Sequence, residues 1–117
     1  MIVKKVAEEP LYENPHGVES VNLYSHPNAV IIRLTLKPGE SLRRHLTPTD
    51  VAFYVLEGKG VVLIGDEKRE VEKDTLIESP ADIVHCWYNE SNEILRVLVI
   101  KAPKPTKPSK FLEERKQ

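Results

Sequence analysis

A regular succession of short β-type runs constrains the fold of this chain more than any other feature. Between residues 18 and 101, runs rich in Val, Ile, Leu, Tyr and Thr alternate with turn residues such as those at 38–39, 58–60 and 65–66. Runs of this length, bounded by Gly, Pro, Asn and Asp, are typical of β-strands. No helical period interrupts them. Many short strands at regular spacing predict one all-β barrel or sandwich.

The predicted strands are the segments with this β character. They cover residues 18–24, 29–37, 41–45, 51–57, 60–64, 68–73, 75–78, 83–88 and 93–101. Because side chains alternate between the two faces of a strand, we expect Arg43, His45 and Thr47 to share one face. The same rule places His85 and Trp87 together on one face of their strand.

Length and charge limit what this chain can be. Its 117 residues support one buried core and no second domain. The 17 basic and 18 acidic residues give a net charge of −1, which argues against binding of nucleic acid or of an anionic membrane. The longest apolar runs are strand-length, well short of the ~20 residues of a membrane span. With one cysteine and no signal-peptide pattern, the chain is expected to be cytoplasmic.

The two ends of the chain differ from the barrel in composition. We assign residues 1–101 to the barrel and residues 102–117 to a Pro/Lys-rich linker and tail. Prolines at 103, 105 and 108 stand among lysines, which favours an extended, hydrated linker. From Phe111 onward the sequence allows a short C-terminal helix of about two turns. His16 and His26 lie beside Gly or Pro and are expected to be solvated loop residues.

The predicted barrel contains two patterns in which turn residues and histidines recur at characteristic spacings. The first is Gly39, His45, Thr47, Val51 and Gly58, and the second is Asp74, Pro80, Asp82, His85 and Asn89. These patterns resemble the pair of motifs of the cupin family. The resemblance implies a small double-stranded β-helix, the cupin jelly-roll barrel. Asp74 and Asp82 stand where the family pattern has glycine, at turn positions that aspartate tolerates.

The resemblance also implies a place for a divalent metal. In cupins the first motif supplies two histidines and a glutamate, and the second supplies one histidine. The matching positions here are His45 and His85, while Thr47 and Val51 replace the other two ligands. Two imidazoles hold Mn, Fe, Ni or Zn weakly unless water or another side chain completes the set. Candidates for that role are Asp50, Glu57, His16 and His26.

Two interpretations of His45 and His85 therefore stay open. They hold a metal, or they hydrogen-bond a ligand or each other in a metal-free cavity. Further candidate ligand contacts are Arg43, Thr47, Phe53 and Trp87. The guanidinium of Arg43 suits a carboxylate or phosphate, or else pairs with an acidic neighbour at the barrel mouth. The two aromatic residues form a ligand-burying wall or part of the core.

We predict a small-molecule-binding barrel whose pocket surrounds His45 and His85. If the protein is an enzyme, the resemblance implies a metal-dependent isomerase, dioxygenase or decarboxylase acting on a small anionic or sugar-like substrate. The alternative is a metal-free binding or sensor module, or an accessory subunit without catalytic activity. Residues 1–6 have β character, and chains that resemble this one often use such a segment to add a strand to a neighbouring subunit. A homodimer is therefore expected.

Overall fold

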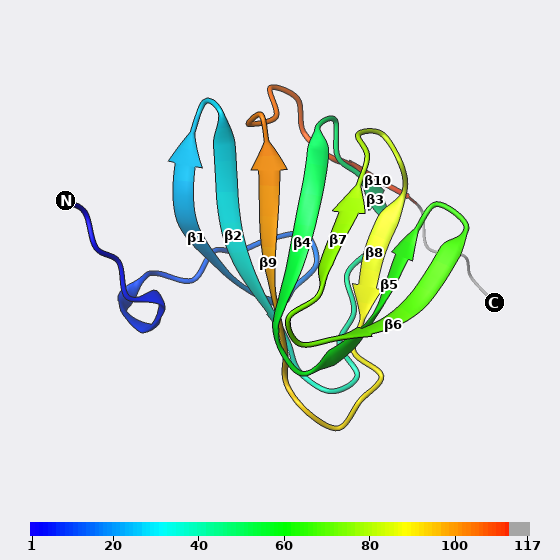
Figure 1. Ribbon diagram of the computed structural model, residues 1–117. Helices are drawn as coiled ribbons and strands as arrows, with labels where there is room; N and C mark the ends of the chain where they lie inside the picture. The colour runs from blue at the N-terminus through cyan, green and yellow to red at the C-terminus, as the bar shows by residue number, and fades with distance from the viewer. Residues whose placement is uncertain (113–117) are drawn as a thin grey trace.

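The structure is a computed structural model that describes residues 1–112 (Figure 1). Its elements in chain order are η1 (Val6–Glu8), β1 (Glu19–His26), β2 (Ala29–Leu36), β3 (His45–Leu46), β4 (Asp50–Glu57), β5 (Lys59–Ile64), β6 (Glu67–Glu72), β7 (Leu76–Ser79), β8 (His85–Tyr88), β9 (Leu95–Ala102) and β10 (Lys110–Phe111). The η1 element is a short 3-10 helix. No helix within residues 1–112 is long and apolar enough to cross a membrane.

Two five-stranded antiparallel sheets form the walls of the barrel (Figure 1). The first has the strand order β1-β2-β9-β4-β7 and the second has the order β10-β3-β8-β5-β6. Strands from the two ends of the chain meet in the first sheet, where β9 lies between β2 and β4. This arrangement confirms the predicted all-β jelly-roll.

The observed strands follow the predicted segments, with one clear exception at residues 41–45. There, only His45–Leu46 forms a strand, and Ser41 makes an isolated bridge to Tyr88. The reason lies in the hydrogen bonds of the backbone. The N–H of Arg43 donates to Nδ1 of His16, 2.9 Å away, instead of to a neighbouring strand. A backbone donor satisfied by a side chain needs no strand partner.

The turn positions of both motifs have the conformations that the spacing predicts. Asp74 and Asp82 adopt left-handed φ angles of 63° and 60°. Their short polar side chains tolerate this region better than most residues. Gly58 has a φ of 82°, and a Cβ at this position would collide with the carbonyl oxygen of Ile94. Glycine is therefore required there by both conformation and space.

The apolar core lies between the two sheets. Alternate residues of each strand point into it, as in the burial of Val51, Phe53 and Val55 along β4. Trp87 of β8 is fully buried, and its ring packs edge-on against Phe53 with ring centroids 5.5 Å apart. Trp87 is therefore part of the core, one of the two roles left open for it.

The segment after β9 is largely exposed, as expected of a hydrated stretch, but hydrogen bonds hold it against the barrel. The Thr49 hydroxyl donates to the carbonyl of Pro103 at 2.8 Å, and the N–H of Lys104 donates to the carbonyl of Pro27 at 3.2 Å. The chain then returns across the barrel, and β10 pairs with β3. The short helix predicted from Phe111 is not formed at that residue, which lies in β10, and residues 113–117 lie outside the described part.

The N-terminal stretch leads away from the barrel (Figure 1). Residues 1–5 form no strand within this chain, and Met1, Ile2 and Val3 are fully or largely exposed. An exposed apolar segment that pairs with no strand within residues 1–112 is compatible with pairing to a second subunit. The homodimer stays a prediction.

Candidate functional site

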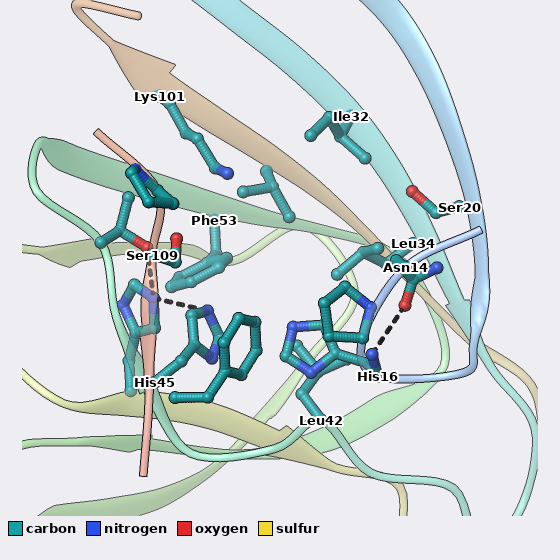
Figure 2. Close-up of a pocket in the computed structure, with 16 residues that line it drawn as sticks. Asn14, His16, Ser20, Ile32, Leu34, Leu42, His45, Phe53, Lys101 and Ser109 are labelled. Carbon is teal, nitrogen blue, oxygen red and sulfur yellow. Dashed lines mark hydrogen bonds between the residues drawn. The ribbon is translucent and has the colours of Figure 1, made fainter. Parts of the chain in front are cut away.

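A cavity of about 330 Å³ opens inside the barrel (Figure 2). Its apolar walls come mainly from the first sheet, and its polar groups come from both sheets and from the loop before β1. The polar lining residues include His16, Ser20, His45, Thr47, His85 and Lys101. Among the lining residues within the described part of the chain there is no aspartate and no glutamate. The C-terminal segment closes one side through Pro108, Ser109 and Phe111.

The structure brings His45 and His85 together, as the motif spacing predicts. The two residues are direct partners in the pairing of β3 with β8, and their Nε2 atoms are 3.1 Å apart. Both side chains are buried. Nδ1 of His45 lies 2.8 Å from the carbonyl oxygen of Arg43, and Nδ1 of His85 lies 2.7 Å from the Ser79 hydroxyl. The Thr47 hydroxyl is 3.2 Å from Nε2 of His85.

These contacts determine which ring nitrogens carry protons. Burial lowers the pKa of His85 to about 3 and also lowers that of His45, so both rings are neutral at pH 7. A carbonyl oxygen only accepts, so Nδ1 of His45 carries the proton and its Nε2 is an acceptor. Nε2 of His85 must then donate to His45, and Nδ1 of His85 accepts from the Ser79 hydroxyl. The pair is thus part of one directed chain of hydrogen bonds from Ser79 to the carbonyl of Arg43.

His16 is a third imidazole of the site, and the prediction that it is a solvated loop residue is wrong. Its ring centroid lies 4.8 Å from that of His45, and its Nδ1 accepts the N–H of Arg43. Burial, followed by the nearby charge of His45, lowers its pKa to about 4. Neutral His16 therefore carries its proton on Nε2, which makes that nitrogen a donor. His26, in contrast, is exposed.

Lys101 is the cationic residue that the sequence prediction missed. Figure 2 shows its side chain reaching into the cavity from β9. Its partners on the two neighbouring strands are Val30 and Val51, and burial lowers the pKa of its amine. A signal was present in the sequence. Alternate residues of β9 face inward, namely Leu95, Val97 and Val99. Lys101 is the next residue in that series.

The remaining predicted ligand contacts divide into two groups. Thr47 and Phe53 line the cavity. Trp87 lies behind Phe53 in the core, and Arg43 is not among the lining residues. The guanidinium of Arg43 lies over the ring of Phe111, 4.8 Å from its centroid. The prediction that Arg43 shares the inward face of His45 is wrong, because strict alternation of faces requires strand geometry and the chain is not a strand at residue 43.

The donor set does not fit a firmly held divalent metal. Within residues 1–112, no group of three or more His, Cys, Asp and Glu side chains is arranged to hold an ion. Val51 offers no donor atom, and the Thr47 hydroxyl is a weak ligand when neutral. Of the replacement ligands proposed from sequence, His26 is exposed, and His16 lines the cavity but uses its Nδ1 to accept the N–H of Arg43. The two carboxylates are engaged elsewhere. The exposed carboxylate of Asp50 accepts the N–H of Ala81, and Glu57 forms an ion pair with Arg96.

The chain matches a protein-family model and a curated protein. The family model described as a cupin domain matches residues 32–101. An uncharacterized protein of Methanocaldococcus jannaschii is 34% identical over 62 residues, and the match covers 53% of this chain and 49% of that protein. The chain therefore spans about half the length of this relative.

Solved structures resemble this one over nearly their whole length. The crystal structure of TT1209 from Thermus thermophilus has a TM-score of 0.77 and 27% identity, covering 90% of this chain and 100% of that one. The polyketide cyclase RemF from Streptomyces resistomycificus has a TM-score of 0.84 over 98% of this chain and 87% of that one. At 18% identity, the likeness to RemF concerns the fold alone.

Proposed function

The chain belongs to the cupin family, and from this membership we propose that its barrel binds a small molecule in the cavity around His45 and His85. The ligand that we propose has an apolar body and an anionic group. Cavities of this kind, with apolar walls and a few convergent polar groups, are the usual form of a small-molecule site. The positive charge of Lys101 and the N–H donor of His16 in the lining support an anionic ligand.

Lys101 is the observation that carries this proposal. Its amine reaches a cavity that has no acidic side chain among the described lining residues. Directly across the sheet is Val51, at the position where the family resemblance implies a metal-binding glutamate. In a metal-binding cupin, the carboxylate at this position balances the positive charge of the metal ion. This chain lacks the carboxylate and carries a cationic side chain beside it, so a ligand anion is left to balance the charge.

The histidines favour the same class of ligand. Neutral His16 presents an N–H donor on Nε2, because its Nδ1 accepts from the backbone of Arg43. The lone pair of His45 Nε2 is occupied by the donor of His85. The three histidines therefore present the N–H of His16 as a donor and leave no ring nitrogen free to accept. Around this donor, Ile32 and Phe53 form apolar wall, where a charge-assisted hydrogen bond is stronger than in water.

The test compares salicylate with salicyl alcohol, which has nearly the same shape and no charge. We expect calorimetric titration to detect tighter binding of salicylate. Lys101→Met should weaken salicylate binding by about 10- to 100-fold, the size expected when one hydrogen bond to a charged group is lost, and leave the alcohol unaffected. Lys104→Met is the matched control, since that amine donates to Ser25 on an exposed surface. Equal binding of both compounds by the wild type contradicts the proposal.

A second candidate function, a metal-dependent enzyme, is favoured by one observation. The two Nε2 atoms of His45 and His85 face each other at 3.1 Å, a spacing that two ligands of one ion can adopt. Metal analysis of protein exposed to Mn, Fe, Ni or Zn and then dialysed tests it. Near-stoichiometric metal that is lost in both His45→Ala and His85→Ala would favour the enzyme, and metal-free wild type would count against it.

A further inference from the structure

We infer that Lys101 is also a reactive amine, which forms an imine with a small aldehyde or ketone bound in the cavity. This activity goes beyond the proposed function, because anion binding uses the ammonium and imine formation uses the neutral amine. Both take place at the same side chain, and the experiment below separates them.

The surroundings of Lys101 differ from those of every other described lysine. The other lysines of residues 1–112 are exposed, whereas Lys101 is partly buried in the cavity. Its neighbours across the sheet are the aliphatic side chains of Val30 and Val51. Neither ion pair found within residues 1–112 involves this amine. A lysine that lacks a carboxylate partner and lies against apolar walls loses its proton more easily than one in water.

The protonation of Lys101 supports this interpretation. Burial lowers the pKa of its amine, and no attractive charge from residues 1–112 opposes that effect. At a given pH, a larger fraction of the Lys101 amine is therefore neutral and nucleophilic than of a fully exposed lysine in water. Desolvation of an amine in an apolar pocket is a general way to activate lysine for attack on carbonyl groups.

The reaction balances without an oxidant or a reductant. The lone pair of the neutral amine attacks the carbonyl carbon, and a C–N bond forms as the C–O double bond opens to a carbinolamine. The carbinolamine oxygen then departs with the two former amine hydrogens as one water molecule, and a C=N bond remains. The N–H of His16, which lines the same cavity, is one donor available to the carbonyl oxygen while negative charge develops on it.

The size of the cavity restricts the carbonyl compound. A space of about 330 Å³ accommodates a molecule of roughly one aromatic ring with short substituents. Phe53 and Leu34 supply apolar wall for such a body. We therefore assign the ligand class to small aromatic or branched aliphatic aldehydes and ketones.

The test uses salicylaldehyde below one equivalent with sodium cyanoborohydride, which converts an imine to a stable secondary amine. At pH 6.5, we expect peptide mass spectrometry to find the label on Lys101 at least tenfold above any exposed lysine. Lys104→Arg should leave this pattern unchanged. An excess of salicylate should reduce the labelling of Lys101 in the wild type. This competition tests the site without any substitution. Lys101→Arg should abolish the preferred site, and its circular dichroism shows whether the barrel is intact.

The outcomes separate the two proposals. Label spread evenly over the exposed lysines, or an unlabelled Lys101, overturns the imine inference. If salicylate still binds in that case, the proposed anion site stands. Strong labelling of Lys101 in a protein that does not bind salicylate supports the imine and rejects the anion site.

Discussion

Acidification from pH 7 to pH 5 should destabilise this fold through its buried histidines. The pKa of His16 is lowered to about 4 and that of His85 to about 3, both from an ordinary value of 6.5. As the pH falls through 6.5, the unfolded chain takes up protons on these rings while the native protein does not. Because the unfolded state then binds more protons, the free energy of unfolding decreases as the pH falls.

The expected loss follows from the protons bound at pH 5. Each histidine with an unfolded pKa of 6.5 stabilises the unfolded state by about 2 kcal/mol between pH 7 and pH 5, provided that its native pKa lies below 5. His16 and His85 both meet this condition, which gives a loss of about 4 kcal/mol. The lowered pKa of His45 adds to it in the same direction. The contribution of His16 should level off below pH 4 and that of His85 below pH 3, where each native ring begins to titrate.

Urea denaturation monitored by fluorescence of the fully buried Trp87 at pH 7, 6 and 5 measures this dependence. His85→Gln should reduce the decrease between pH 7 and 5 by about 2 kcal/mol, whatever the stability of this variant at pH 7. His26→Gln is the control, since His26 is exposed and its loss should leave the decrease unchanged. A wild type whose free energy of unfolding falls by less than about 1 kcal/mol over this range would refute the reasoning.

Two further predictions concern the metal-ligand positions and the C-terminal segment. Thr47→His combined with Val51→Glu should bind Zn²⁺ or Mn²⁺ through dialysis where the wild type does not. The Nε2 atoms of His45 and His85 are 3.1 Å apart, so two bonds of ~2.1 Å from them to one ion would meet at about 95°. Two ligands of one ion can adopt this angle. Metal analysis that finds both proteins empty contradicts this. Phe111→Ala should raise the pKa of His16 toward 6.5, because the Phe111 ring, 5.3 Å from that of His16, helps to bury it. Titration of the His16 ring by NMR measures the shift. If the pKa of His16 is unchanged in the variant, residues other than Phe111 bury this ring.

Strand pattern and motif spacing are local properties, and they were predictable. Inward and outward residues alternate along β4 and β9 in the sequence as they do in the structure. The turns at Asp74 and Asp82 follow from the motif, since a short polar residue tolerates the left-handed backbone that these turns adopt. The meeting of His45 with His85 follows from the same pattern. Each of these depends on residues within one strand or on a spacing typical of the family.

The sequence by itself thus determined the barrel and the pair of histidines at its centre. Only the tertiary structure decided the rest of the site: His16 and Lys101 line it, the C-terminal segment covers it, and Arg43 lies outside it. The physical reason is that these placements depend on contacts between distant parts of the chain. One bond, from the Arg43 N–H to the His16 ring 27 residues away, joins a loop histidine of the cavity to the stretch where the predicted strand is absent. The guanidinium of Arg43 lies over the ring of Phe111. No local pattern of residues encodes such a contact.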